Sequence, residues 1–247
     1  MNNFDTIVIG GGHAGCEAAA ASARIGVKTL LLTKHISTIG AMSCNPAMGG
    51  IGKGHLIREI DAFDGLMGTI SDLSGIQFRV LNRSKGPAVQ GPRAQIDRSL
   101  YLTNMQKALK EQKNLTIVEA SVNDIIIENN TICGIRCDQG EYFCNSLILT
   151  TGTFLNGVIH CGKNATPGGR YGEAPTTTLS KRLKKFDLSL SRLKTGTPAR
   201  LMKDSINYEL LEEQKGDTPP EPFSYMSNKI NVPQTVCHIT HTNEKTH

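Results

Sequence analysis

The chain has 247 residues, of which 38% are hydrophobic and 20% charged, and its 27 basic and 22 acidic residues leave a net charge of +5. This composition is ordinary for a soluble globular protein of one large or two small domains. Its apolar runs are far shorter than the roughly 20 residues of a membrane helix, which excludes a membrane-spanning chain. The mild positive charge permits an RNA partner without requiring one.

The N-terminus and the cysteines indicate the compartment. No basic segment or apolar run precedes the first predicted strand, so there is no sign of a signal peptide and we expect a cytoplasmic protein. The seven cysteines are odd in number, and no pair has Cys-x-x-Cys spacing. We therefore expect free thiols in a reducing compartment and no metal site.

The first 33 residues predict a βαβ unit. Residues 6–9 form a short apolar run, residues 17–24 are an alanine-rich helix that ends near Gly26, and residues 27–33 form a second buried strand. Two strands joined through a helix in so short a segment are typical of a parallel sheet.

The turn inside this unit carries the dinucleotide fingerprint, Gly10-x-Gly12-x-x-Gly15. The first glycine makes the tight turn, the second lets a pyrophosphate approach the backbone, and the third lets the helix pack on the strand. The motif follows a strand and opens a helix, which is the context that a nucleotide-binding turn requires.

The end of the second strand departs from the usual pattern. An acidic residue that binds a ribose hydroxyl is expected there, but the strand ends in Thr33, followed by Lys34 and His35. Thr33 can still make one hydrogen bond. Lys34 and His35 would instead suit a 2′-phosphate, which favours NADP and leaves the cofactor open at this point.

The rest of the chain mixes long loops with short elements. Residues 36–54 form a glycine-rich loop of the kind that more often has a function than not, and residues 82–92 and 216–233 are also irregular. Helices are predicted at 56–63, 93–112 and 180–186, and strands at 115–118, 122–128, 131–137, 141–144 and 147–150.

The closely spaced strands before Thr150-Thr151-Gly152-Thr153 predict an antiparallel insertion followed by a buried strand with a small-residue end. FAD-binding domains have such an insertion, whereas simple NAD domains usually continue with further βα units. We therefore favour FAD, with Gly152 near the place where a long dinucleotide passes over the sheet edge.

Cys44 is the candidate nucleophile. It lies in the glycine-rich loop rather than on an apolar face, and Lys53 and His55 nearby would lower its pKa. The alternative is a small buried hydrophobic residue. Cys16, just after the glycine turn, is expected to pack or cap the helix.

Basic residues form three clusters, each of which by itself is most simply a solvated face. Together they would suit a polyanion or a folate tail. The clusters are Lys53, His55 and Arg58; Arg79, Arg83, Lys85, Arg93 and Arg98; and Lys181, Arg182, Lys184 and Lys185.

Several segments closely resemble the MnmG (GidA) family of tRNA uridine 5-carboxymethylaminomethyl modification enzymes. The resemblance covers the whole chain, to its last residues Thr240–His247. The segments are Gly11-Gly12-His13-Ala14-Gly15, Ser43-Cys44-Asn45-Pro46-Ala47-Met48-Gly49-Gly50-Ile51-Gly52-Lys53-Gly54-His55, Lys85-Gly86-Pro87-Ala88-Val89, Arg93-Ala94-Gln95-Ile96-Asp97 and Arg192-Leu193-Lys194-Thr195-Gly196-Thr197-Pro198.

The resemblance implies a fold and an activity. The fold is α/β: a glutathione-reductase-like, Rossmann-type FAD-binding domain with an antiparallel β insertion, an inserted NAD-binding domain and a helical C-terminal domain. The activity uses FAD, NADH and methylenetetrahydrofolate to add an aminomethyl or carboxymethylaminomethyl group to carbon 5 of a wobble uridine in tRNA. Family members work with the GTPase MnmE as a heterotetramer and are expected to be homodimers when full length.

Carried onto this sequence, the resemblance assigns Cys44 as catalytic and Val122 and Thr176 as further FAD contacts. Residues 1–200 would be an incomplete FAD-binding domain and residues 201–247 the start of the inserted NAD-binding domain, so we expect a fragment that is inactive alone. The expected FAD pyrophosphate site is Gly10, Gly11, Gly12, His13, Ala14, Gly15 and Cys16.

Two alternatives remain on the sequence. One is a generic FAD or NADP oxidoreductase that acts on a small substrate, supported by Lys34 and His35. The other is a non-catalytic remnant, supported by the short length relative to the family.

Overall fold

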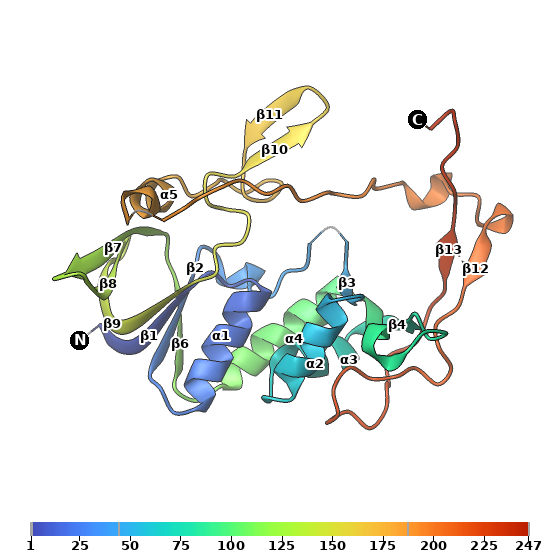
Figure 1. The fold of residues 1–247 in the computed structure, drawn as a ribbon, viewed down its shortest axis with the longest axis horizontal. Coiled ribbons are helices and arrows are strands. Elements are labelled where there is room, and N and C mark those ends of the chain that lie inside the picture. Colours follow the sequence, from blue (N-terminus) through green and yellow to red (C-terminus); the bar gives the residue numbers. More distant parts are fainter. Residues whose placement is uncertain (1, 44, 187, 247) are drawn as a thin grey trace. The chain divides into compact units, whose positions relative to one another are not determined.

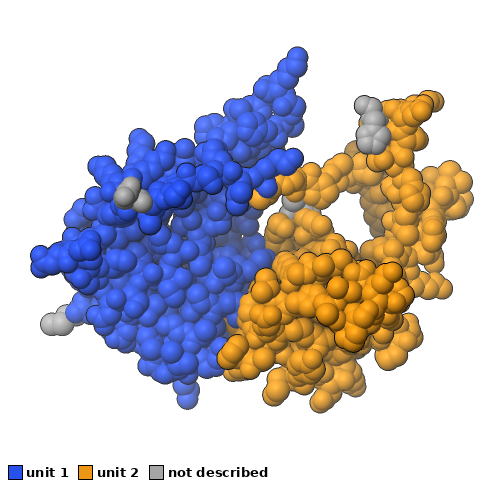
Figure 2. Space-filling view, in the orientation of Figure 1, with its two compact units in different colours: residues 1–41, 105–194 blue, residues 42–104, 195–247 orange. Residues whose placement is uncertain are grey.

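The computed structural model describes residues 2–43, 45–186 and 188–246. The chain divides into two compact units, residues 1–41 with 105–194 and residues 42–104 with 195–247 (Figure 2). Each unit joins two segments that are distant in sequence. The boundary predicted at residue 200, between an FAD-binding and an NAD-binding domain, stays a prediction.

The first unit is built on a six-stranded sheet in the order β6-β2-β1-β9-β8-β7 (Figure 1). β1 pairs in parallel with both β2 and β9, β2 pairs in parallel with β6, and β7, β8 and β9 form an antiparallel meander. The strands are β1 (Asn3–Ile9), β2 (Thr29–Thr33), β6 (Leu115–Glu119), β7 (Val122–Glu128), β8 (Thr131–Cys137) and β9 (Gly140–Leu149). The predicted Rossmann-type α/β fold with an antiparallel insertion is confirmed.

The helix α1 (His13–Arg24) packs on this sheet through small side chains. Its buried face consists of Cys16, Ala19, Ala20 and Ala23, whose short side chains let the helix lie close to β1 and β2. All five residues of β2 are buried, as expected for a central parallel strand covered on both faces.

The remaining elements of the first unit are short. α5 (Thr178–Leu183) packs on β7 through Leu179 and Leu183, which cluster with Ile125. A hairpin of β10 (Val158–Cys161) and β11 (Asn164–Pro167) precedes it, and 3₁₀ turns lie at Ile36–Thr38 and Lys184–Phe186.

The second unit holds an antiparallel sheet in the order β3-β5-β4. Its strands are β3 (Ala47–Gly49), β4 (Gly75–Leu81) and β5 (Gly91–Ile96), with helices α2 (Lys53–Asp61) and α3 (Leu66–Asp72) and a small pair, β12 (Glu212–Gln214) and β13 (Cys237–Ile239). Further 3₁₀ turns lie at Pro87–Val89, Lys203–Ser205 and Tyr208–Leu210. α4 (Arg98–Glu111) carries the boundary between the units at residues 104 and 105.

Some predicted elements were wrong. Residues 93–96 are strand rather than helix, because Ala94 and Ile96 alternate inward in β5 with period two. The strands predicted at 141–144 and 147–150 are one strand, β9, which leaves its antiparallel partner β8 and continues beside β1. α3 and β4 were not predicted. Within the described residues, no helix is long and apolar enough to cross a membrane.

Two buried carboxylates hold the later segment of the second unit. Asp72, at the end of α3, accepts hydrogen bonds from the backbone N–H groups of Phe223 (2.7 Å) and Ser224 (2.9 Å), and Asp61 accepts one from Tyr225 (3.0 Å). Phe223 is fully buried and its ring contacts that of Phe78. A segment with little regular structure is thereby fixed to the α2–α3 pair.

We expect Asp72→Ala to destabilise the chain by about 2–4 kcal/mol, because it leaves two buried N–H donors without an acceptor. Urea unfolding followed by circular dichroism measures the change. Asp204→Ala, at an exposed 3₁₀ turn, is the matched control and should change stability by less than about 0.5 kcal/mol. Equal losses in the two variants would contradict this role of Asp72.

Candidate dinucleotide-binding site

The glycine turn lies at the carboxyl edge of the parallel strands. β1 ends at Ile9 between β2 and β9, both parallel to it, and the chain passes through Gly10 and Gly11 into α1. In open α/β sheets ligands bind at this edge, outside the carboxyl ends of the strands.

Backbone atoms leave no room for a side chain at Gly10 or Gly15. A Cβ at Gly15 would overlap the carbonyl oxygen of Gly10, and a Cβ at Gly10 would overlap that of Thr150. Gly10 also has φ +111°, a conformation that L side chains rarely adopt. These glycines let the first turn of α1 lie directly against the end of β1.

Gly12 differs from its neighbours because a Cβ there would meet nothing within 4 Å. It is the N-cap of α1, is exposed, and has an ordinary φ of −75°. No side chain caps the helix, and its first turn holds no acidic residue. The positive end of the helix dipole therefore faces open space, which is the arrangement that binds a phosphate group.

Thr150 completes this junction through hydrogen bonds that could not be predicted from the sequence. Its hydroxyl donates to the carbonyl oxygens of Ile9 (2.8 Å) and Gly10 (3.1 Å), and its N–H donates to Ile9 (2.9 Å). A threonine after a buried strand is visible in the sequence, but its partners lie 140 and 141 residues away.

Lys34 and His35, which follow β2, both have contacts within the fold. The Lys34 ammonium donates to the carbonyl of Ala174 (2.9 Å) and lies over the Phe154 ring, 5.0 Å from its centroid. His35 lies 3.7 Å from the Glu119 carboxylate. Lys34 is thus engaged within the fold, which weakens the case for a 2′-phosphate partner.

Glu119 places an acidic side chain beside the end of β2. It is the last residue of β6 and pairs with Thr33, so its carboxylate lies at the same sheet edge. One oxygen accepts the N–H of Ile36 at 2.8 Å. The sequence alone does not show which strand lies beside β2, so it could not place Glu119 at this edge.

The other predicted contacts occupy different settings. Val122 begins β7 and belongs to the same buried cluster as Ile9. Gly152 is exposed after β9, in the left-handed region at φ +54° with no atom near its missing side chain. Thr176 is half-buried, and both its N–H and its C=O are bonded, to Phe154 and Asn156. Only its side chain remains for a ligand.

His13 and Ala14 form the start of α1, and Cys16 lies beneath the turn. The Cys16 thiol is fully buried and donates to the carbonyl of Gly11 at 3.5 Å. Burial raises the pKa of the Cys16 thiol to about 12, and the charge of Glu17 adds to the effect. The thiol is therefore neutral at physiological pH.

Cys44, the predicted nucleophile, lies outside the described residues. The two basic residues expected to act on it have partners of their own. Lys53 donates to the Ala47 carbonyl at 3.4 Å, and His55 joins the N-cap of α2 to the Pro87–Val89 turn. The Nδ1 atom of His55 accepts the N–H of Gly52, so Nε2 carries the proton and donates to the carbonyl of Ala88.

Comparison with known proteins assigns the family. The family model described as "Glucose inhibited division protein A" matches residues 5–247. The chain belongs to this family. Two curated members named tRNA uridine 5-carboxymethylaminomethyl modification enzyme MnmG, from Thermodesulfovibrio yellowstonii and Granulibacter bethesdensis, are each 53% identical over 99% of this chain and 39% of their own length.

The fold agrees with that of a solved family member. A crystal structure of Aquifex aeolicus GidA superposes with a TM-score of 0.91 and 48% sequence identity, covering 96% of this chain and 41% of that chain. The present chain thus spans about two fifths of the length of these relatives.

Gly15 and Gly12 are expected to differ in how much an added methyl group changes the stability of the chain. Gly15→Ala places a Cβ on the Gly10 carbonyl and should destabilise the chain by about 2 kcal/mol or more. Gly12→Ala meets open space at an ordinary φ and should change stability by less than about 1 kcal/mol. Thermal unfolding measures both. Equal stability of the two variants would contradict the geometry of the turn.

Proposed function

We propose that this chain is the FAD-binding N-terminal part of an enzyme that modifies the wobble uridine of tRNA. The open, uncapped N-terminus of α1 at Gly12 is the observation that carries the cofactor proposal, because it offers a phosphate site at the sheet edge. The names of the curated family members supply the substrate class.

The residues of the turn fit a dinucleotide. Gly10 to Cys16 would hold the pyrophosphate, with Gly12 giving the closest approach of the backbone. The backbone of Val122 would serve the adenine region, and Gly152 and Thr176 would contribute later contacts. The carboxylate of Glu119 would serve a ribose hydroxyl at the edge shared with Thr33.

FAD is favoured over NADP on two grounds. The antiparallel meander β7-β8-β9 is the insertion expected of FAD-binding domains. The Lys34 ammonium, which would meet a 2′-phosphate, is already bonded to Ala174 and placed over Phe154. A generic NADP oxidoreductase therefore loses its main support.

When bound, FAD would supply electron transfer between NADH and a one-carbon unit derived from methylenetetrahydrofolate. Cys44 would act on the uridine itself: its thiolate adds to carbon 6, which makes carbon 5 nucleophilic. After carbon 5 has gained the new bond, loss of its proton re-forms the double bond and releases the thiolate. Cys16 cannot take this role, because its thiol is buried and neutral.

The partners follow from the same proposal. The enzyme would act in the cytoplasm on tRNA, together with a GTPase of the MnmE type in a heterotetramer, and would form a homodimer when full length. Residues 1–200 would belong to the FAD-binding domain and residues 201–247 would begin an inserted NAD-binding domain.

A chimera tests the proposed function. This chain replaces the matching 246 residues of the Thermodesulfovibrio relative, and modified nucleosides from tRNA are measured by mass spectrometry. We expect the chimera to form the modified wobble uridine, and Gly12→Ala and Cys44→Ser each to reduce its rate by roughly 100-fold or more.

Cys161→Ser is the matched control, since Cys161 is an exposed thiol at the end of β10, and it should leave the rate unchanged. A normal rate for Cys44→Ser would exclude that residue as the nucleophile. A folded, FAD-loaded chimera that modifies no tRNA would overturn the function.

A further inference from the structure

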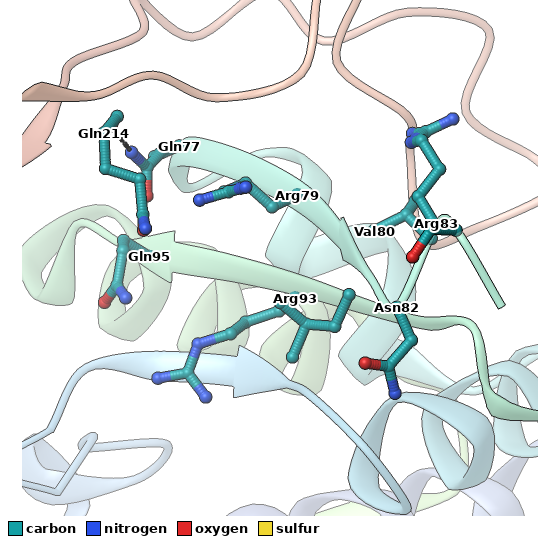
Figure 3. A pocket seen from close by; sticks show the side chains of 10 residues that line it. Gln77, Arg79, Val80, Asn82, Arg83, Arg93, Gln95 and Gln214 are labelled. Carbon is teal, nitrogen blue, oxygen red and sulfur yellow. Dashed lines mark hydrogen bonds between the residues drawn. The ribbon is translucent and has the colours of Figure 1, made fainter.

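A second polar site lies on the β4–β5 sheet of the second unit. A cavity of about 540 Å³, within the size range of small-molecule sites, opens over these two strands (Figure 3). Three of its lining residues are arginines and four are amides. The lining residues are Gln77, Arg79, Val80, Leu81, Asn82, Arg83, Ser84, Arg93, Gln95 and Gln214.

The strand register brings two of these arginines together. β4 and β5 are antiparallel, and Arg79 lies directly opposite Arg93, next to the pair Gln77 and Gln95. Side chains directly opposite on one face of a sheet have Cβ atoms about 5 Å apart. The strand pair therefore presents two arginine side chains from neighbouring positions on one face, both drawn in Figure 3.

This arrangement has an electrostatic cost that no direct hydrogen bond or ion pair to either arginine offsets in the described chain. Like charges directly opposite each other destabilise a strand pair. Both arginines are half-buried, yet among the residues that the structure describes neither guanidinium makes a hydrogen bond or an ion pair. Arg83, at the end of the same strand, is instead paired with Asp217 at 2.8 Å and Glu221 at 3.6 Å.

Asp217 is the acidic group whose charge reaches Arg79, and it is committed elsewhere. Its Oδ2 atom accepts both the Arg83 guanidinium and the backbone N–H of Val80 at 2.7 Å. Burial raises the pKa of Asp217, but these bonds and the charges of Arg83 and Arg79 lower it overall. The carboxylate is thus ionised at neutral pH and already bonded.

The positive field also acts on Lys53. Partial desolvation lowers the pKa of its ammonium, and the charge of Arg93 lowers it further. Gln77 is already bonded, to the carbonyl of Gln214 and the thiol of Cys237, whereas Gln95 makes no such bond in the described chain. Arg79, Arg93 and Gln95 therefore offer side-chain N–H donors to the cavity that are not used within the described chain.

We propose that this cavity binds an oxyanion, a carboxylate or a phosphate group of a small ligand, between Arg79 and Arg93. The planar guanidinium group offers paired N–H donors that match either oxyanion in a two-point contact. The anion neutralises the facing charges, and the Gln95 amide donates a further hydrogen bond. This site goes beyond the proposed function and does not depend on it.

Calorimetric titration of the 247-residue chain with inorganic pyrophosphate and, separately, with glutarate tests the site and separates its two sources. We expect at least one probe to bind, with affinity reduced roughly tenfold or more in Arg79→Gln and in Arg93→Gln. Arg200→Gln, an exposed arginine in the same unit, is the matched control and should bind within twofold of the parent. Preference for pyrophosphate indicates a phosphate ligand, and preference for glutarate a carboxylate.

Pyrophosphate bound at the N-terminus of α1 would keep its affinity in Arg79→Gln and Arg93→Gln. Affinity that is lost in these two variants therefore belongs to the cavity. Binding of both probes that is independent of Arg79 and Arg93, or a loss that Arg200→Gln shares, overturns the proposal.

Thermal unfolding gives a second measurement that separates binding from a structural role. In buffer free of oxyanions, Arg79→Gln removes a like-charge neighbour and should unfold at the same temperature as the parent or higher. Addition of the bound probe should raise the unfolding temperature of the parent and of Arg200→Gln, but not that of Arg79→Gln. A lower unfolding temperature of Arg79→Gln without oxyanion makes the arginine structural and overturns the proposal.

Discussion

The absence of side chains at Gly10 and Gly15 is the constraint on which the first unit depends. It allows the first turn of α1 to touch the carbonyl of Gly10, while the Thr150 hydroxyl lies within hydrogen-bond distance of the carbonyls of Ile9 and Gly10. Helix, central strand and the end of β9 therefore meet without a gap. The same contact leaves the N-terminus of α1 facing open space at Gly12, where the proposed function places a phosphate group.

Buried or half-buried carboxylates hold the second unit together. Asp61 and Asp72 accept hydrogen bonds from backbone N–H groups of residues 223–225, and Asp217 joins Arg83 to the backbone of β4. These bonds fix long irregular segments to a small sheet. Because these carboxylates already have partners, Arg79 and Arg93 face each other on β4 and β5 without a directly bonded counter-charge. Such like-charge neighbours destabilise a strand pair unless a ligand supplies the negative charge.

Local pattern predicted the βαβ unit well, because strand, glycine turn and alanine-rich helix are all encoded within residues 6–33. The failures have a common cause in long-range contacts. Residues 93–96 became strand through pairing with β4, and β9 is continuous because it changes partner from β8 to β1. The contacts of Thr150 and Glu119 could not be predicted, because they depend on sheet order, which no local pattern specifies.

The proposed cofactor site places the pyrophosphate of FAD against the turn from Gly10 to Cys16. Titration of the isotope-labelled chain with FAD, followed through its backbone amide NMR signals, tests this placement. We expect saturable shifts that are largest at the amides of residues 11–16, with smaller ones near Gly152. Saturation without shifts in the turn, or no binding by a folded chain, would contradict it.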